Sequence, residues 1–436
     1  MCTLSRSFVK DLPAKVGNKV RVCGFVHTLR NQKKRQFLLV QDISGTAQVF
    51  HEKADNESLA ELIGSLTTGS TVEVVGKVVS NPSVKLGGVE LVVESLSVSS
   101  VAEKPLPMVE DSSLEVCLDW RHISLRFPQN ALVMRVQTAF EYALRRFWAE
   151  RGFLEIHSPK LMGTASESGS ELFELDYFGG KAYLAQSPQF YKQMAMAAGL
   201  ERIFEIGPVF RANPSYTSRH DTEFTSVDVE ISWVESHEDV MVLEEEMLQY
   251  ALAEVFSQLG DEIRNVFGVE TKVPALPFPR ISLEDARQAL ASRGHIIDHK
   301  ADLDPPGERM LSEYIKEQFG HEFVFVTDYP ADVRAFYHMR YPDRPKVTKS
   351  FDLLWKGLEI TTGAQREHRY DALKQQATEK GYSLEPLQHY LNFFRYGCPP
   401  HGGFGVGLTR ILMVMLERKN VREVTYLYRG PNRLTP

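Results

Sequence analysis

Cysteine and long apolar segments are both scarce in this sequence, and each shortage excludes a class of protein. Four cysteines occur among 436 residues, and no two of them form a CxxC pair. This excludes a disulfide-rich secreted fold and a cysteine zinc site, so we expect reduced thiols. No apolar run approaches the roughly 20 residues of a membrane-spanning helix, and no signal-peptide pattern opens the chain. We therefore expect a cytoplasmic protein without a membrane partner.

Positive charge is scarce as well, because acidic residues outnumber basic ones and the formal net charge is −7. A nucleic-acid partner usually requires a basic surface, so the overall charge argues mildly against one. The local exception is a compact basic cluster of Arg30, Lys33, Lys34 and Arg35. Taken alone, such a cluster is most simply a solvated loop.

Short β segments separated by turns dominate residues 1–104. Five strands are predicted, with one short helix at 59–66 between the third and the fourth. This pattern in a module of about 100 residues is typical of a small barrel such as an OB-fold, and an SH3-like barrel would look similar. The predicted strands are Val20–Val26, Gln36–Gln41, Thr46–Phe50, Thr71–Val79 and Val89–Val93.

A proline-containing linker, 105–128, separates this barrel from a larger unit at 129–436. An amphipathic helix is predicted at 129–150, because apolar residues recur there at helical spacing. The strands that follow are flanked by helices without a regular βαβ rhythm, which predicts an α+β domain on an antiparallel sheet. A helix-rich stretch predicts a small helical insertion at 262–322.

Two alternating strands around a polar loop, 202–211 and 223–230, predict an antiparallel hairpin. Alternation places Phe224 and Asp228 on one face of the second strand, and apolar residues on the other. Arg211 and Arg219 bracket the loop, and two guanidinium groups so placed can hold a polyphosphate. Two ordinary surface ion pairs would give the same pattern.

A second hairpin is predicted at 350–363, where Trp355-Lys356-Gly357 turns the chain. The turn brings Asp352 and Glu359 onto neighbouring strands. Two carboxylates that converge beside a hydroxyl suit magnesium, a hard cation that prefers oxygen ligands. Two acids at a solvated sheet edge are the alternative.

Glycine is concentrated at 402–407, where four of six residues are glycine, just before Arg410 and an apolar helix. Glycines allow the backbone to come close to a ligand or to another strand. The segment lacks the lysine of a phosphate-binding P-loop. The residue next to this segment that indicates a function is Arg410. It stands at the start of the helix, where the helix dipole favours the binding of anions.

Together with the segment that follows the predicted helix at 129–150 and ends at Pro159, these stretches resemble the signature motifs of class II aminoacyl-tRNA synthetases. The segment ending at Pro159 resembles the first motif, which forms a homodimer, the Arg211 hairpin resembles the second, and 405–410 resembles the third. A barrel ahead of the catalytic domain resembles the subgroup that handles aspartate, asparagine and lysine. The short link between the second motif and the magnesium stretch is similar to the archaeal type.

The segment 185–193 indicates which amino acid is used. Aspartyl-tRNA synthetases have a QSPQ-x-x-KQ pattern whose lysine meets the side-chain carboxylate of the substrate, and Lys192 matches it. A neutral asparagine side chain needs no such cation. Arg366 matches the arginine that clamps the same carboxylate. The other aspartate-binding positions that the resemblance implies are Glu167, Gln189, Asp228 and Thr362.

The resemblance also implies ATP as co-substrate and Mg²⁺ as cofactor. Arg211 and Arg219 would grip the α- and γ-phosphates, while Phe224 and Arg410 would cover the two faces of adenine. With these three arginines as catalytic residues, aspartate would attack ATP to form aspartyl-adenylate, from which tRNA takes the amino acid. The other implied ATP-binding residues are His220, Glu359 and Gly407, and the implied metal ligands are Asp352, Glu359 and Thr362.

In the barrel, the resemblance implies contacts with the tRNA anticodon, through His27, Arg30, Phe37, Gln48 and Glu90. Strict archaeal-type enzymes tend to carry tryptophan at the position of His27, whereas relaxed relatives tend to carry histidine. We therefore expect a non-discriminating enzyme that charges both tRNA(Asp) and tRNA(Asn). A tRNA-dependent amidotransferase is then a candidate downstream partner. Alternatively, His27 is a barrel residue with no part in tRNA selection.

Three positions depart from the family pattern. Asn213 replaces a usual glutamate, Thr362 stands where serine is common, and Tyr428-Arg429-Gly430-Pro431 replaces an expected Pro-Arg-Asp. The rival interpretations are a strictly discriminating aspartyl enzyme, an asparaginyl-tRNA synthetase, a synthetase-like asparagine synthetase and a non-catalytic tRNA-binding paralogue. Lys192 and Asp228 argue against the asparaginyl enzyme, the barrel argues against the asparagine synthetase, and the intact arginines and acids argue against the paralogue.

Overall fold

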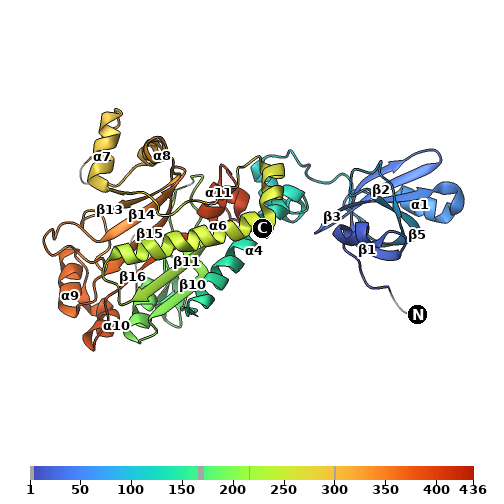
Figure 1. Ribbon diagram of the computed structural model, residues 1–436. Helices are drawn as coiled ribbons and strands as arrows, with labels where there is room; N and C mark the ends of the chain where they lie inside the picture. Colours follow the sequence, from blue (N-terminus) through green and yellow to red (C-terminus); the bar gives the residue numbers. More distant parts are fainter. Residues whose placement is uncertain (1–3, 165–170, 216, 299–300) are drawn as a thin grey trace. The chain divides into compact units, whose positions relative to one another are not determined.

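The computed structural model describes residues 4–164, 171–215, 217–298 and 301–436. The chain forms two compact units, Met1–Ala131 and Leu132–Pro436, and each is described by itself (Figure 1). No helix within the described ranges is long and apolar enough to cross a membrane. The described cysteines are free thiols, as expected, and they are Cys23, Cys117 and Cys398. The predicted linker and insertion boundaries remain predictions.

The first unit contains a closed five-stranded barrel, which confirms the predicted all-β architecture. The strands join in the order β1-β2-β3-β5-β4, and helix α1 (Glu57–Ser65) follows β3, as the sequence predicts. Asn56 caps this helix by accepting a hydrogen bond of 3.0 Å from the Leu59 amide. The strands are β1 (Lys19–Asn31), β2 (Arg35–Asp42), β3 (Gly45–Glu52), β4 (Thr71–Ser80) and β5 (Val89–Ser100).

Every second residue of the barrel strands points inward, since side chains alternate across a strand. Val22, Val40 and Val74 are completely buried there, and they belong to three different strands. The residues between them face outward. The short helices of this unit are η1 (Val9–Lys15), η2 (Lys53–Asp55), α2 (Leu114–Asp119) and α3 (Arg121–Ser124), and α4 (Pro128–Glu150) contains the division between the units.

The second unit contains a sheet of eight strands in its described part, in the order β12-β13-β14-β15-β16-β11-β10-β6. The central strands from β13 to β10 all pair antiparallel, and only the edge strands pair parallel to their neighbours. This confirms the predicted α+β class. The strands are β6 (Leu154–Glu155), β10 (Arg202–Phe210), β11 (Glu223–Ser232), β12 (Arg280–Ser282), β13 (Phe323–Thr327), β14 (Ser350–Trp355), β15 (Leu358–Arg366) and β16 (His401–Gly407), and a smaller sheet joins β7 (Leu161–Met162), β9 (Gly180–Leu184) and β8 (Glu174–Tyr177).

Helices pack against this sheet, and the long helix α6 (His237–Phe267) crosses β15 and β16 (Figure 1). A capping box of Ser236 and Asp239 starts α6, and Gly268 ends it in the left-handed conformation. The buried side of α6 anchors the strands that carry the candidate site. The other helices are α5 (Gln189–Ala197), α7 (Leu283–Ser292), α8 (Pro305–Phe319), α9 (Tyr370–Glu379), α10 (Leu384–Arg395), α11 (Leu408–Met415) and α12 (Val421–Val424).

Both predicted hairpins are present in the sheet. Strands β10 and β11 pair from Arg202 to Phe210, and their connecting loop starts at Arg211. Strands β14 and β15 are joined at Lys356-Gly357, whose φ angles of 49° and 79° are those of a tight hairpin turn. Asp352 faces Thr362 directly across this second hairpin. The two hairpins therefore bring the predicted arginines and acids onto one sheet.

Candidate active site

A cleft of about 350 Å³ opens on the sheet of the second unit. Its walls come from α5, the β10–β11 hairpin, β15, β16 and the start of α11, which are far apart in sequence. Asp352 does not line the cleft, and Glu167 lies outside the described residues. The predicted site residues that do line it are Gln189, Lys192, Arg211, Arg219, His220, Phe224, Asp228, Glu359, Thr362, Arg366, Gly407 and Arg410.

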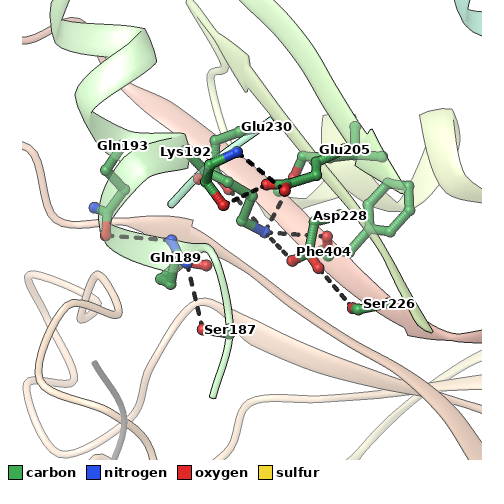
Figure 2. Close-up of polar contacts among 12 residues, drawn as sticks. Ser187, Gln189, Lys192, Gln193, Glu205, Ser226, Asp228, Glu230 and Phe404 are labelled. Carbon is green, nitrogen blue, oxygen red and sulfur yellow. Dashed lines mark hydrogen bonds and ion pairs between the residues drawn. The ribbon is translucent and has the colours of Figure 1, made fainter. Parts of the chain in front are cut away.

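One end of the cleft, which we term the buried end, is organised around Lys192 of α5. The Lys192 side chain is 1% exposed, and its ammonium lies 2.8 Å from Asp228 Oδ1 and 3.4 Å from Glu230 Oε2 (Figure 2). The ammonium also donates to the Phe404 carbonyl at 3.2 Å. A buried lysine needs such partners, because an isolated charge is costly away from water. The site therefore holds a fixed cation at this end of the cleft.

Arg366 of β15 completes the buried end. Its Nε donates to Glu230 Oε1 at 3.1 Å, and its Nη2 donates to the Gly403 carbonyl at 3.0 Å. Glu230 therefore bridges Lys192 and Arg366, and two carboxylates balance two cations. Gly403 is required at this point, because a Cβ there would collide with the Glu230 carboxylate.

His338 supports Arg366 from behind. Its Nε2 lies 3.1 Å from Arg366 Nη1, and its Nδ1 lies 3.1 Å from the Ala335 carbonyl. Burial and the charge of Arg366 hold the pKa of His338 well below its ordinary value. The ring is therefore neutral, donates through Nδ1 to Ala335 and accepts from Arg366 through Nε2.

Gln189 stands at the first turn of α5, beside Lys192. Its side-chain amide donates to Gln193 Oε1 at 3.2 Å, and its backbone amide donates to Ser187 Oγ at 3.3 Å (Figure 2). Gln193 in turn accepts from the Tyr390 hydroxyl at 2.9 Å. This chain of buried contacts fixes the glutamine against the cleft.

The opposite end of the cleft, which we term the open end, carries most of the arginines. Arg211 is exposed, and its guanidinium carbon lies 5.5 Å from the centroid of the Phe224 ring. Arg410 donates to the Glu359 carbonyl at 3.0 Å and to the Glu359 carboxylate at 3.3 Å. Cationic, aromatic and partly exposed groups in this arrangement can take up a planar base and its phosphates.

Arg219 and His220 extend the open end along the loop between β10 and β11. Arg219 Nη1 lies 2.7 Å from Glu308 Oε2 of helix α8. Burial, together with the charges of Arg410, Arg219 and Arg211, lowers the pKa of His220. His220 is therefore a neutral hydrogen-bonding group at neutral pH.

The predicted metal position consists of oxygen donors on β15. Thr362 Oγ1 donates to Glu359 Oε1 at 3.3 Å, and both residues line the cleft. Asp352 lies behind them and forms an ion pair of 2.5 Å with Arg334, while its Oδ1 has no hydrogen-bond partner in the described part of the chain. The described residues contain no group of three or more acidic, histidine or cysteine side chains that could enclose a metal. Glu359 and Thr362 nevertheless fit Mg²⁺, which uses few protein ligands and completes its shell with water and phosphate.

Two loop residues that the sequence did not single out as binding groups also line the cleft near Arg211. Asp221 is 8% exposed and accepts from the Thr409 hydroxyl at 3.3 Å. Burial raises the pKa of Asp221 to about 7, although Arg410 and Arg211 oppose the shift. Asn213, the departure from the family pattern, uses its side chain to accept from the Ser215 amide at 2.8 Å. Asn213 therefore stabilises the loop itself.

In the barrel, four of the predicted anticodon residues gather on outward-facing positions of adjacent strands. Arg30 of β1 pairs with Phe37 of β2, and Leu39 of β2 pairs with Gln48 of β3. Phe37 packs on Phe50 with the ring centroids 5.5 Å apart. The Gln48 amide donates to the Glu90 carboxylate of β5 at 2.9 Å. These positions form one polar and aromatic surface of the kind that stacks on unpaired bases.

His27, the fifth of these residues, is exposed and lies where the β1–β2 register shifts between Val26 and Thr28. A bulge re-aims the side chain that it carries. The sequence does not reveal this bulge, because one extra residue in a strand interrupts the alternation of apolar residues at a single position only.

Family models match both units of the chain. The model described as tRNA synthetases class II (D, K and N) matches residues 113–429, and the model described as an OB-fold nucleic acid binding domain matches residues 20–99. The chain thus belongs to the class II tRNA synthetases of the aspartate, lysine and asparagine group. The predicted OB-fold and the predicted class of enzyme are both confirmed.

Full-length relatives narrow this class. An aspartate–tRNA(Asp/Asn) ligase of Aeropyrum pernix is 41% identical over 99% of this chain and 100% of its own length. An aspartate–tRNA(Asp) ligase of Pyrococcus abyssi is 40% identical over 96% of this chain and 97% of its own. An asparaginyl-tRNA synthetase of Pyrococcus horikoshii, solved with asparaginyl-adenylate, matches with a TM-score of 0.92 at 32% identity over 100% of both chains. Within the class, the chain belongs to the aspartate–tRNA ligase family.

Proposed function

We propose that this protein attaches L-aspartate to tRNA(Asp) and tRNA(Asn) in an ATP-dependent reaction that passes through aspartyl-adenylate. The observation that carries the choice of aspartate is the pair of buried cations, Lys192 and Arg366, that share Glu230 at one end of the cleft. The carboxylate of an aspartate side chain offers only hydrogen-bond acceptors to these two donor groups, whereas the amide of asparagine would place an NH₂ donor against one of them.

In the proposed reaction, Asp228, Gln189 and Glu167 orient the α-amino group of aspartate, and the buried cations hold its side chain. The α-carboxylate is then directed toward the α-phosphorus of ATP. This carboxylate is already ionised, so the attack requires no general base. Rate enhancement comes from alignment and from stabilisation of charge on the phosphate by Arg211.

At the open end, Phe224 and Arg410 hold adenine between them, and Arg219 and His220 bind the terminal phosphates. Gly407 lies where the backbone meets the ribose and base. Asp352, Glu359 and Thr362 would hold Mg²⁺ through their side-chain oxygen atoms. When bound, the metal neutralises phosphate charge.

The outward barrel surface is proposed to bind the anticodon. Phe37 stacks on a base, Gln48 and Glu90 read base edges, and Arg30 contributes charge toward the phosphates. His27 is smaller than tryptophan and lies on a bulge, so it would leave room for the third anticodon base of either tRNA. We further propose a homodimer, a cytoplasmic location and an amidotransferase that acts on Asp-tRNA(Asn).

The test is aminoacylation with radiolabelled aspartate and asparagine on purified tRNA(Asp) and tRNA(Asn). Aspartate is expected on both tRNAs and asparagine on neither. Charging with asparagine would identify an asparaginyl-tRNA synthetase instead. The variant His27→Trp is expected to charge tRNA(Asp) as before and to lose the charging of tRNA(Asn). Unchanged charging of both tRNAs would show that His27 takes no part in tRNA selection.

A further inference from the structure

The guanidinium of Arg219 is held by a carboxylate that does not belong to the cleft. Arg219 lines the cleft, whereas Glu308 does not. Their ion pair is short, at 2.7 Å, and largely shielded from water, with 18% and 8% of the two side chains exposed. Glu308 therefore contacts the arginine from the side away from the proposed nucleotide.

Glu308 is itself fixed in space by the first turn of α8. Asp304 caps this helix by accepting from the Gly307 amide at 2.8 Å, and the helix begins with two prolines. Farther along, Leu311 and Ile315 are buried against β13. The carboxylate is consequently carried by a rigid element rather than by a loop.

The same turn of α8 also touches the hairpin that bears the candidate metal ligands. A Cβ at Gly357, in the β14–β15 turn, would come within 2.9 Å of the Arg309 Cα atom. Helix α8 thus packs closely against that hairpin next to the residue that holds Arg219. It sets the arginine relative to the strands that carry Glu359 and Thr362.

Only one nitrogen of Arg219 is occupied by this contact. Nη1 donates to Glu308, and no described residue receives a hydrogen bond from Nη2 or Nε. A guanidinium presents its donors in a fixed plane, so anchoring one of them fixes the direction of the others. The remaining donors are available to phosphate oxygens in the cleft.

We propose that Glu308 is a positioning residue for amino-acid activation, which holds Arg219 oriented toward the terminal phosphates of ATP and of departing pyrophosphate. This inference rests on the proposed role of Arg219. It assigns to the helix that carries Glu308 an indirect part in nucleotide binding, through Arg219.

The test is ATP–pyrophosphate exchange by the full-length variants Glu308→Ala and Glu308→Gln. The expected result for Glu308→Ala is a KM for ATP and for pyrophosphate raised about 10-fold or more, as when the outer partner of a ligating group is removed. The KM for aspartate is expected to stay unchanged, because the buried end is untouched. Glu308→Gln keeps the shape and the hydrogen bond, and is expected to show a smaller change.

The matched control is Glu317→Ala, which removes another ion pair of the same helix, with Arg293, on the protein surface. It is expected to behave like the unmodified enzyme. The double variant Arg219→Ala/Glu308→Ala is expected to be no worse than Arg219→Ala alone. Such a cycle isolates action through the arginine.

Several outcomes would overturn the inference. Kinetics of Glu308→Ala equal to those of Glu317→Ala would do so, as would a lower KM for ATP, which would make Glu308 a competitor of the phosphates. A full additional loss in the Arg219→Ala background would show that Glu308 acts by another route. Normal exchange by Arg219→Ala would instead refute the proposed role of the arginine, and the positioning role with it.

Discussion

The two ends of the cleft differ in how their charges are balanced. At the buried end, Lys192 and Arg366 are almost completely shielded from water and are paired with carboxylates of the protein itself. At the open end, Arg211 is exposed, and Arg410 is partly exposed and contacts Glu359, which is more exposed than Arg410. The protein itself thus fixes the cations of the buried end, whereas the arginines of the open end are more accessible to solvent.

This difference indicates how the site divides its tasks. A buried, fully paired network is rigid and discriminates strongly, because any wrong partner leaves a charge unpaired. A partly solvated cluster of arginines can accept a flexible polyphosphate and release pyrophosphate again. We expect mutations at the buried end to affect both stability and amino-acid choice, and mutations of the arginines at the open end to affect nucleotide binding and rate.

The largest expected effect comes from removing the buried lysine. Lys192→Met would leave Asp228 without its cation, which costs about 3–5 kcal/mol of unfolding free energy in comparable buried pairs. The kcat/KM for aspartate is expected to fall by roughly 10⁴-fold. Denaturant unfolding and pyrophosphate exchange measure the two effects.

A suitable control is Lys181→Met, which removes an exposed pair with Glu174. Its expected cost is about 0–1 kcal/mol. Equal stability losses in the two variants would contradict the distinction between buried and open charge.

The second effect is confined to catalysis. Arg211→Ala is expected to slow pyrophosphate exchange by roughly 10²–10³-fold, as for other preorganised groups that stabilise developing charge. Stability should change by no more than about 0.5 kcal/mol, because the side chain is exposed. Arg202→Ala, at the other end of the same strand, is the control, and a similar loss of rate there would argue against the role of Arg211.

A third effect concerns pH and a buried carboxyl at the open end, that of Asp221. The pKa of Asp221 is about 7 in the folded protein, against 3.8 for an ordinary aspartate. The folded state therefore binds more protons than the unfolded state between these values. The contribution of Asp221 to stability is present below pH 4 and is lost as pH rises toward 7, with a slope of at most about 1.4 kcal/mol per pH unit.

Asp221→Asn removes this titration. Unfolding free energies measured from pH 4 to 8 are expected to fall less steeply in the variant than in the unmodified protein. Glu244, whose pKa burial raises to about 8, remains in both proteins and cancels in the difference. Parallel pH curves would contradict the assignment of the shift to Asp221.

The smallest expected effect is at the candidate metal position. Thr362→Ala is expected to raise the Mg²⁺ concentration needed for half-maximal exchange by roughly 3- to 10-fold, the equivalent of about 1 kcal/mol. Thr361→Val is the contrast, since the hydroxyl of Thr361 bonds to Glu244 instead. That variant is expected to lose stability and keep its Mg²⁺ requirement.

Much of the fold follows from local patterns in the sequence. Alternating residues predict the five barrel strands and both hairpins, and the observed strands extend the predicted ones by a few residues at the ends. The stretch after α4 forms only a short strand, because only Leu154 and Glu155 pair with a neighbouring strand. Elements with a strong periodic pattern of apolar residues can be predicted from the sequence. Whether a single short segment forms a strand depends on the strand that packs beside it.

The supporting contacts of the site could not be predicted in this way. Glu308 meets Arg219 across 89 positions of sequence, and Arg334 meets Asp352 from a segment without regular structure. The sequence marks Asp352 as an acid near a hydroxyl but does not reveal the buried arginine that shares it. Such ion pairs form when separate elements pack together, so a periodic pattern in the sequence does not predict them.

The bridge formed by Glu230 has a consequence for how amino-acid choice evolves in this fold. An asparaginyl-tRNA synthetase has nearly the same backbone, with a TM-score of 0.92, so the scaffold itself is no obstacle to a change of substrate. The obstacle is that two cations, Lys192 and Arg366, share the carboxylate of Glu230. Replacing any one of these three residues would leave a buried charge without its partner. A lineage that exchanges acid for amide must therefore change several residues together, or pass through an ancestor that folds poorly.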